Sequence, residues 1–586
     1  MKKIDFVDQT LRDAQQSLWG FVMRTDHMTP IAEVMDRVGY KAVTTVGSQA
    51  FTVQVRILNE DPWERIRLLS SLITKTPIRG SYQIGSLSSF DLSTPRDIIT
   101  LWIKRSVANG IKSFWICDYQ TDMEKFIYFA RIAKAEGAEV VAALMYTASP
   151  VHDRAHWTRK TRLLASAKDC VDRIMVEDAS GVITPEATRE LAATVLENCD
   201  GLPVEFHSHC NAGLAPLCYL EAIKAGITTV HTAVAPLANG TSLPATETIL
   251  RNAKRLGFTS DIDEDALALV SAHFRKIAEQ EGLPTGVPQD YDLFHFDHQV
   301  PGGMMSNLIR QLREVGMVDR LDEILEEVVL VRKDFGYPVM ATPYSQIVGA
   351  QAMENVLSGE RYKQFTDEAI KYVVGCYGEP VGPIDENLKD RIMSQPRAKQ
   401  FVGWQPENYL KSVEELRKEI GPDLSDDELL LKILIPGQPL KRAEPRKEAK
   451  YTLNKHAGGP VNVPASFPTQ FNVEVDGEAF NVKISPVWDG EEGAEADGQA
   501  QEIGTFKKAT KGNGALEGAV AAGMAGLVLS IEVKEGDTVS AGDLLAMIEA
   551  MKMRRQVSAP HGGTIREILA EVGEIVQPED ILMVVQ

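Results

Sequence analysis

The amino-acid sequence predicts an α/β fold, a (β/α)8 barrel with an appended helical region and a small all-β domain at the C-terminus. Three observations predict it. Through about residue 260, short β-rich runs alternate with helical patterns. From about 262 to 440 the strand signal disappears and helical patterns dominate. Residues 513–586 contain an internal repeat of strand-like segments.

The barrel depends on eight strand-like runs, each followed by a helical pattern. They lie at residues 4–8, 42–46, 78–82, 113–117, 140–144, 174–178, 204–208 and 229–233. Eight such units are typical of a TIM barrel, whose active site lies where the strands end at their C-terminal side. An open doubly wound sheet is the alternative, because the number of strands alone does not exclude it.

Length and composition narrow the class of protein. A chain of 586 residues is longer than one hydrophobic core usually supports, so we expect two to four domains. The net charge of -20 argues against nucleic-acid binding, because phosphate contacts need clustered Lys and Arg. Six dispersed cysteines without a C-x-x-C pair suggest neither a disulfide framework nor a structural zinc site.

The sequence predicts where the protein is located. The N-terminus MKKIDFVDQTLRD is charged where a signal peptide is apolar, and no later run has the roughly 18 apolar residues of a membrane span, so we expect a cytoplasmic protein.

The polar segments indicate the domain limits. The alternating stretch 471–484 predicts two strands joined at Asp476-Gly477, and the acidic segment 489–504 predicts a linker. The expected domains are a barrel at 1–300, a helical domain at 301–440 that completes the active site, linkers with a small β segment at 441–512, and a carrier at 513–586.

The C-terminal repeat surrounds a single lysine. GLVLSIEVKEGDTVSAGDLLAMI (526–548) aligns without a gap on GTIREILAEVGEIVQPEDILMVV (563–585), which predicts two equivalent β-halves. A tight turn through the intervening EAMKM (549–553) would expose Lys552. This pattern resembles the attachment site of biotinyl domains, whereas lipoyl domains usually lack a Met on both sides of the Lys. The resemblance implies a covalent biotin on Lys552, attached by a biotin protein ligase.

Candidate metal ligands gather at the predicted strand ends. His207 and His209 are two residues apart on one strand, so they share a face and can bind one metal together. Asp13 follows the first strand and Glu177 ends the sixth. Because these ends meet at one mouth of a barrel, we expect a divalent-metal site there, with Zn²⁺ as the expected ion and Mn²⁺ or Co²⁺ as alternatives.

Several long motifs extend over residues 1–440. They are TLRDAQQSL (10–18), NEDPWER (59–65), RG (79–80), HQVPGGMMSNL (298–308), TPYSQIVGAQA (342–352) and NVLSGERYK (355–363). They resemble the carboxyltransferase of pyruvate carboxylases, transcarboxylases and oxaloacetate decarboxylase alpha subunits. The resemblance implies that Asp13, His207 and His209 bind the metal. It also implies that Arg12 and Gln16 lie beside the substrate, that Arg79 clamps the substrate carboxylate and that Thr342 shuttles a proton at biotin.

The resemblance implies a reversible reaction. Carbon dioxide would move between carboxybiotin on Lys552 and a 2-oxo acid, most simply pyruvate or oxaloacetate, through a metal-stabilised enolate. A metal and Arg79 would polarise the 2-oxo acid, and Thr342 would pass a proton between its methyl group and biotin. Since each step is reversible, the direction depends on the partners of the chain.

The sequence departs from this family at three places around one pocket. Glu177 stands where the family has a carbamylated lysine that binds the metal, and TTVGSQAF retains only Gly47 and Phe51 of a Glu-x-Trp-Gly-Gly segment. RGSY (79–82) replaces Arg-Gly-x-Asn. We predict that Glu177 is an unmodified metal ligand. A different acceptor, 2-oxoglutarate or an unfamiliar one, stays open, as does an inactive barrel.

The sequence contains no glycine-rich ATP-binding segment of a biotin carboxylase. A separate biotin carboxylase subunit would then load the biotin, which makes the chain half of a two-subunit carboxylase. We also expect the chain to form a homo-oligomer. Alternatively the chain is the alpha subunit of a sodium-pumping decarboxylase, peripheral to a membrane subunit. A non-catalytic carrier and scaffold is the third interpretation. The sequence alone leaves the acceptor, the direction, the metal, the oligomeric state and the partner open.

Overall fold

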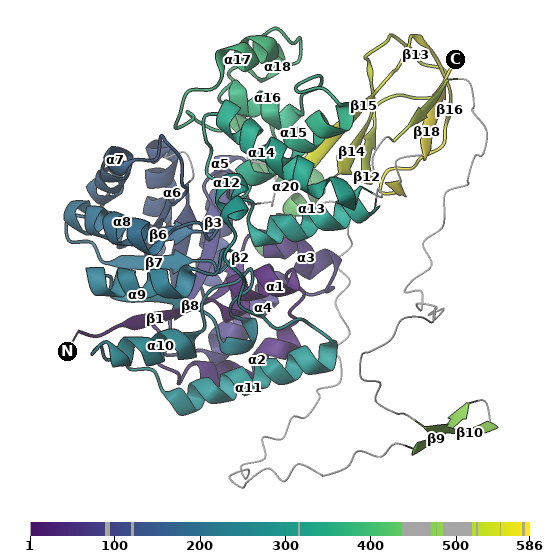
Figure 1. The fold of residues 1–586 in the computed structure, drawn as a ribbon. Coiled ribbons are helices and arrows are strands. Elements are labelled where there is room, and N and C mark those ends of the chain that lie inside the picture. The colour runs from purple at the N-terminus through teal and green to yellow at the C-terminus, as the bar shows by residue number, and fades with distance from the viewer. Residues whose placement is uncertain are drawn as a thin grey trace. The chain divides into compact units, whose positions relative to one another are not determined.

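The computed structural model describes residues 2–87, 94–118, 122–314, 317–435, 470–475, 478–483, 518–522, 526–550, 553–576 and 580–586. Eight parallel strands close a barrel in the order β1 to β8, which confirms the predicted (β/α)8 fold (Figure 1). The strands are β1 Asp5–Asp8, β2 Ala42–Gly47, β3 Ile78–Gln83, β4 Ser113–Cys117, β5 Glu139–Met145, β6 Arg173–Asp178, β7 Val204–Ser208 and β8 Thr229–Thr232. Each predicted run overlaps its strand.

Helices surround the barrel, and several of them begin at a residue whose side chain caps the helix. The longer ones are α2 Thr25–Met35, α4 Pro62–Leu72, α5 Arg96–Ala108, α6 Met123–Ala135, α7 Arg154–Ser166, α8 Pro185–Asn198, α9 Ala215–Ala225, α10 Thr246–Arg255 and α11 Glu264–Glu281. Thr184, for example, caps α8 by accepting a hydrogen bond from the Ala187 amide, and Pro185 follows it. No helix in the described ranges is both long and apolar enough to cross a membrane.

The interior of the barrel is layered. Side chains alternate between the two faces of each strand, so every second residue points inward. Four charged residues, Arg79, Glu139, Arg173 and Glu205, are joined by ion pairs at one level. Further along the strands an apolar cluster follows, which contains Trp115, Val141, Met145 and Met175. The polar residues of the site lie at the C-terminal ends of the strands.

A helical region with its own apolar core lies over those strand ends, as the sequence predicts (Figure 1). It contains α12 Leu293–His298, α13 Gly302–Glu314, α14 Leu321–Asp334, α15 Tyr344–Ser358, α16 Asp367–Val373, α17 Glu386–Met393, α18 Ala398–Phe401 and α19 Pro406–Tyr409. Several hydrogen bonds attach it to the barrel. Among them, Gln83 Nε2 donates to the Thr342 carbonyl at 2.8 Å, and Ser180 Oγ donates to the Met340 carbonyl at 2.8 Å. The core of the barrel and that of this region are therefore separate but linked at the mouth.

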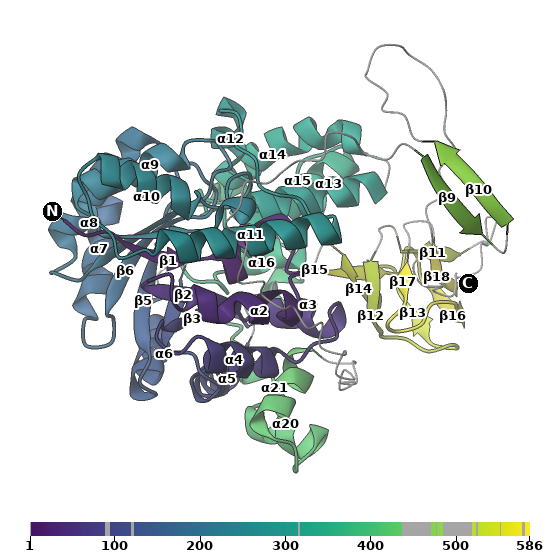
Figure 2. The same cartoon turned by 90° about the horizontal axis from the view of Figure 1, so that it is seen from below.

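The last helices before residue 436 return to the side of the barrel. They are α20 Val413–Ile420 and α21 Asp426–Leu434, which lie beside α4 and α5 (Figure 2). Arg105 Nε donates to Asp427 at 2.7 Å, and Trp63 Nε1 donates to the Asp427 carbonyl at 3.1 Å. Leu430 and Leu431 are buried in the core of the barrel domain. The chain thus crosses the mouth and then packs along the outer surface.

The C-terminal domain has the symmetry that the repeat predicts. Its strands are β11 Ala519–Ala521, β12 Gly526–Ile531, β13 Thr538–Val539, β14 Leu544–Ala550, β15 Met553–Ser558, β16 Gly563–Ile568, β17 Ile575–Val576 and β18 Ile581–Val585. They form two four-stranded sheets, β11-β18-β16-β13 and β15-β14-β12-β17, in which the two halves exchange equivalent strands. Lys552 lies between β14 and β15, outside the described residues.

The alternating stretch near residue 475 forms an isolated hairpin. Strands β9 Gln470–Val475 and β10 Glu478–Lys483 pair antiparallel, with Val475 opposite Glu478. The predicted turn residues Asp476 and Gly477 lie outside the described residues. The hairpin belongs to a separate unit, residues 445–511.

Candidate metal and substrate site

Three of the predicted ligands converge at the mouth of the barrel. Asp13 Oδ2 lies 3.3 Å from His207 Nε2 and 3.5 Å from His209 Nε2, and the possible ligand atoms all lie within 4.8 Å of one another. All three side chains are buried. Within the described ranges, His207 Nε2 has no hydrogen-bond partner. A buried nitrogen left unpaired beside a carboxylate is the arrangement expected where a cation binds.

The loop after β6 positions the two histidines. Asp178, the last residue of β6, accepts hydrogen bonds from the amides of Val182 and Ile183 and from Ser208 Oγ, and its carbonyl accepts from the His209 amide. Gly181 has a φ of +66°, and a Cβ there would stand 2.6 Å from the His209 carbonyl oxygen. The absence of a side chain at Gly181 therefore lets this loop lie close to the backbone of His209.

Hydrogen bonds on the opposite edge of each ring orient the histidines. His209 Nδ1 lies 2.8 Å from the Thr241 carbonyl, which can only accept, so this nitrogen carries the proton. His207 Nδ1 lies 3.2 Å from His231 Nδ1. Both Nε2 atoms consequently lie near Asp13.

Burial and neighbouring charges shift the pKa values of the clustered residues in opposite directions. Burial alone would raise the pKa of Asp13, but Arg12 and His209 hold that pKa well below its usual range. For His209, burial would lower the pKa, and the charge of Asp13 outweighs burial and raises it. Burial and the negative charge of Asp13 together raise the pKa of Glu177 to about 8. The two carboxyl groups thus repel each other when both are ionised, and a bound cation would relieve this repulsion.

Glu177 does not belong to the three-residue cluster. Its Oε2 accepts a hydrogen bond from Trp115 Nε1 at 2.8 Å and lies 3.9 Å from Cys117 Sγ. It nevertheless lines the same cavity as Asp13 and His209. Direct ligation by Glu177 therefore stays a prediction.

The cavity beside the cluster has a volume of about 300 Å³. Six of the predicted site residues line it: Arg12, Asp13, Gln16, Glu177, His209 and Thr342. Residues 301–304 and Gln346 of the helical region complete the walls. A cavity of this size, closed by two domains, is suited to a small polar ligand.

Arg12 brings a positive charge to this cavity. Its guanidinium pairs with Asp13 at 2.9 Å and lies over the Trp115 ring, 4.6 Å from the ring centre. Its Nε is buried without a hydrogen-bond partner among the described residues. A Cβ at Gly47 would come within 3.3 Å of that Nε, so the retained glycine leaves room for Arg12.

Arg79 does not line the cavity. Its side chain is fully buried, where Nε donates to Ser113 Oγ at 2.9 Å and Nη1 donates to Glu205 at 2.7 Å. A further contact joins Nη2 to Glu139 at 3.2 Å. These carboxylates occupy the guanidinium, so the substrate-clamp role remains a prediction from the resemblance.

Thr342 and Gln16 offer polar atoms at the rim. Thr342 Oγ1 accepts a hydrogen bond from Gln346 Nε2 at 3.0 Å, and its carbonyl accepts from Gln83. Gln16 Oε1 is buried and has no hydrogen-bond partner within the described part of the chain. Both side chains therefore have capacity for a ligand.

Sequence reasoning does not identify Trp115, Glu205 or His231. Trp115 links Glu177 to Arg12, and Glu205 and His231 lie directly beneath His207. Glu205 has a detectable signal, because it stands two residues before His207 and shares its face of β7. For Trp115 and His231, an inward position in a strand is the only signal.

Three family profiles match the chain. They are HMGL-like at residues 3–273, the conserved carboxylase domain at 296–484 and the biotin-requiring enzyme domain at 518–585. Together with the barrel and its ligand cluster, they define a biotin-dependent carboxyltransferase, an enzyme that carries biotin covalently.

Proteins that are similar to this chain over nearly its full length define the family more closely. The chain is 38% identical over 557 residues to a pyruvate carboxylase subunit of Methanocaldococcus jannaschii, covering 94% of each chain. It is 32% identical over 632 residues to the 2-oxoglutarate carboxylase large subunit of Hydrogenobacter thermophilus, covering 99% of this chain and 95% of the relative. The chain belongs to the family that contains these carboxyltransferase subunits.

Solved structures show the same fold. The carboxyl transferase domain of Rhizobium etli pyruvate carboxylase with pyruvate matches with a TM-score of 0.67 and 23% identity. The match covers 74% of this chain and 76% of that domain. At this identity the similarity establishes the architecture of the barrel and the helical region.

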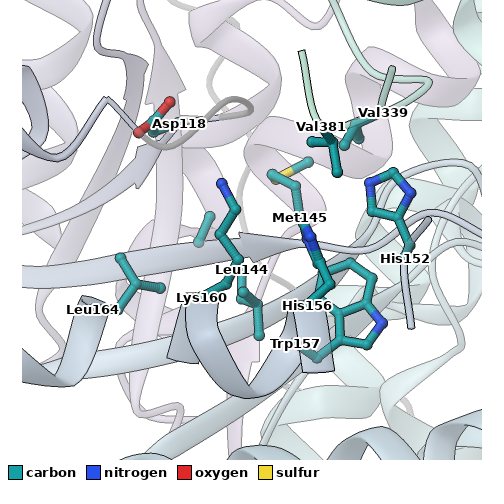
Figure 3. Close-up of a pocket in the computed structure, with 11 residues that line it drawn as sticks. Asp118, Leu144, Met145, His152, His156, Trp157, Lys160, Leu164, Val339 and Val381 are labelled. Carbon is teal, nitrogen blue, oxygen red and sulfur yellow. The ribbon is translucent and has the colours of Figure 1, made fainter. Parts of the chain in front are cut away.

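A second, much smaller cavity of about 20 Å³ lies beside β5 and α7 (Figure 3). Its lining includes Asp118, His152, His156 and Lys160, and Figure 3 shows the Lys160 side chain extending from α7 into it. Burial lowers the pKa of His152 to about 3 and that of His156 to about 4, so both rings are neutral near pH 7. Burial likewise lowers the pKa of Lys160 to about 8.

We expect Lys160→Met to stabilise the chain at pH 7, and the advantage to shrink as the pH rises. In the folded chain Lys160 titrates near 8, against an ordinary value of 10.5, so between these values the unfolded chain binds more protons and folding stability rises with pH. The gain at pH 7 should not exceed a few kcal/mol, since one pKa unit corresponds to about 1.4 kcal/mol. Thermal unfolding from pH 7 to 10 measures it.

The exposed Lys168, which pairs with Asp200, provides the control. Lys168→Met should leave the pH dependence unchanged. A Lys160→Met chain whose stability tracks the wild type at every pH would contradict the shifted pKa.

Proposed function

We propose that this enzyme moves a carboxyl group between biotin on Lys552 and a 2-oxo acid, with pyruvate and oxaloacetate as the substrate pair. The observation that carries the proposal is the 38% identity, over 94% of both chains, to the pyruvate carboxylase subunit of M. jannaschii. A second pyruvate carboxylase subunit, from Methanothermobacter thermautotrophicus, is 36% identical over 567 residues. The cavity with its ligand cluster supplies the site that such a reaction needs.

2-Oxoglutarate is the second candidate substrate. The relative named 2-oxoglutarate carboxylase large subunit covers 99% of this chain. Its support is weaker, because the identity falls to 32%. The three departures around the pocket, at Glu177, at residues 44–51 and at residues 79–82, keep the acceptor a question for experiment.

Asp13, His207 and His209 would hold a divalent metal. The fit rests on the donor set, two imidazole nitrogens and a carboxylate, and on the unpaired Nε2 of His207. A bound metal supplies Lewis acidity toward the carbonyl of a 2-oxo acid. We infer Glu177 as a fourth ligand: Trp115 binds its Oε2, which leaves Oε1 available. Zn²⁺ is the expected ion.

Arg12 and Gln16 would bind and orient the substrate. Arg12 carries the charge that a carboxylate requires, and its guanidinium is fixed by Asp13 and Trp115. A 2-oxo acid offers only hydrogen-bond acceptors, so Gln16 would contact it through its amide nitrogen, which donates. The clamp role of Arg79 is kept as a secondary proposal, because its present contacts are all internal.

Thr342 would move the proton. Because Gln346 donates to Thr342 Oγ1, the hydroxyl hydrogen of Thr342 is free to be donated into the cavity. Gln83 fixes the Thr342 backbone from the barrel side. A hydroxyl held in this way can give a proton to one oxygen or carbon and recover it in the reverse direction.

We infer that a separate biotin carboxylase subunit loads the biotin, as the word subunit in the names of two relatives suggests. A biotin protein ligase would attach it. The alternatives with a membrane decarboxylase subunit or a non-catalytic scaffold, the cytoplasmic location and a homo-oligomeric state remain proposals. The same holds for the domain limits 1–300, 301–440, 441–512 and 513–586, although the conserved carboxylase profile extends to residue 484.

His209→Ala should reduce divalent-metal content in the purified chain to near zero, because it removes one of three converging ligands. Glu177→Gln should weaken binding by a smaller factor. Elemental analysis after dialysis checks both. His273→Asn, in α11, removes a histidine outside the site and should retain the metal. A metal-free wild type would refute the metal site, and undiminished affinity in Glu177→Gln would exclude Glu177 as a ligand.

Thr342→Ala should lower carboxyl transfer by about 10²–10⁴-fold, the usual contribution of a positioned acid or base. Thr342→Ser retains the hydroxyl and should keep most of the activity. The assay follows loss of ¹⁴C label from protein charged by a biotin carboxylase, with pyruvate and 2-oxoglutarate compared directly. Equal activity in Ala and Ser variants would remove Thr342 from the mechanism, and label loss with neither 2-oxo acid would refute the substrate class.

Coexpression with a biotin ligase should add the mass of one biotin, and Lys552→Ala should abolish both the added mass and turnover. Lys534→Ala, in the loop between β12 and β13, should retain both. Intact-protein mass spectrometry makes the measurement. Biotin found on a different lysine would refute the assignment of Lys552.

A further inference from the structure

We infer that Glu205 and His231 form a hydrogen-bond relay that determines which nitrogen of His207 is available to the metal, and that Arg79 anchors this relay. The inference deepens the proposed metal site and rests on it. All four side chains are fully buried inside the barrel. They come from β3, β7 and β8, and none is a ligand except His207.

The relay begins at a fixed negative charge. Arg79 Nη1 lies 2.7 Å from Glu205 Oε2, and Arg173 Nη1 lies 3.5 Å from Glu205 Oε1. A carboxylate buried between two guanidinium groups is stable only as the paired ion. Glu205 can therefore accept hydrogen bonds but cannot donate one.

The next step assigns the proton of His231. His231 Nε2 lies 2.8 Å from Glu205 Oε2. Because Glu205 only accepts, His231 Nε2 carries the hydrogen. A neutral imidazole has one N–H, so His231 Nδ1 is left as an acceptor. Gln9 Nε2, 2.9 Å away, also donates to this atom, so the single lone pair of His231 Nδ1 is shared between Gln9 and His207.

The last step assigns the proton of His207. Its Nδ1 lies 3.2 Å from the acceptor His231 Nδ1, so His207 donates from Nδ1. The lone pair of the neutral ring is then on Nε2, the atom 3.3 Å from Asp13 that has no hydrogen-bond partner among the described residues. The relay thus presents His207 in the one tautomer that can bind a metal beside Asp13.

This arrangement gives Arg79 a positioning role. Its guanidinium contacts Glu205, Glu139 and Ser113, all inside the barrel. Glu205 and His207 are two residues apart on β7, so anchoring Glu205 also fixes the face and the height of His207. Glu205, His231 and Arg79 are thus positioning residues that act through His207.

Co²⁺ binding to the purified full-length chain tests the relay, with visible absorption reporting the ligand geometry. Glu205→Gln should weaken Co²⁺ binding by about 10–100-fold, the usual effect of losing a partner that orients a ligand. Glu139→Gln is the matched control: it removes an Arg79 carboxylate of the same charge that does not contact His231. Its Co²⁺ affinity should stay close to that of the wild type.

A second pair of variants involves no change of charge. His231→Leu removes the acceptor and should weaken Co²⁺ binding like Glu205→Gln, whereas His231→Asn places an oxygen where Nδ1 stood and should restore it. Thermal unfolding of the metal-free proteins separates these effects from loss of stability. If Glu205→Gln does not fold, the His231→Leu and His231→Asn variants alone test the relay.

Three results would overturn the inference. Co²⁺ affinities that are equal in the wild type and in His231→Leu would refute the relay and leave the metal site intact. An effect of Glu139→Gln as large as that of Glu205→Gln would show that only the charge beside Arg79 matters. A wild type that binds no Co²⁺ would refute the proposed metal site and the relay with it.

Discussion

The ion pair between Arg79 and Glu205 is the interaction on which the arrangement of the site depends. A closed barrel excludes water from its inward side chains, and a buried charge without a partner costs several kcal/mol. Arg79 on β3 therefore requires the carboxylates of Glu205 on β7 and Glu139 on β5. A slip of one residue in either strand would turn these charges to the opposite face. The pairing thus selects the register that also directs His207 toward the mouth.

The site is complete only where two cores meet. The barrel contributes the charged groups, Asp13, Arg12 and the two histidines, while the helical region contributes Thr342 and the wall at residues 301–304. Hydrogen bonds that include those from Gln83 and Ser180 join the two parts. The buried charged residues thus belong to the barrel, whereas the residue proposed to move a proton is held from the adjoining helical region.

Much of the fold and part of the site could be predicted from the sequence, because both follow from short-range patterns. β-rich runs locate the eight strands, and two-residue spacing places His207 and His209 on one face. The internal repeat predicts the paired halves of the C-terminal domain.

Depth within the barrel could not be predicted in the same way. Alternation shows which side a residue faces, but its height depends on the register of strands that are distant in the sequence. The motif around Arg79 therefore points to the substrate, although its guanidinium lies among the carboxylates of Glu205 and Glu139. For the same reason the sequence does not single out Trp115 and His231.

The glutamate at position 177 affects contacts beyond the proposed metal site. Its side chain reaches about 4 Å less far than the carbamylated lysine of the family, given ordinary bond lengths. In this chain the carboxyl group is bound by Trp115, and the Trp115 ring supports Arg12, which pairs with Asp13. The shorter acidic side chain of Glu177 on β6 is thus connected, through the Trp115 indole, to Arg12, the residue proposed to bind the substrate. Arg12 also depends on the space left by Gly47 of β2, which the chain retains, so Gly47 and Glu177 both affect the same guanidinium. The departure at position 177 is therefore connected through Trp115 to the residue proposed to bind the substrate.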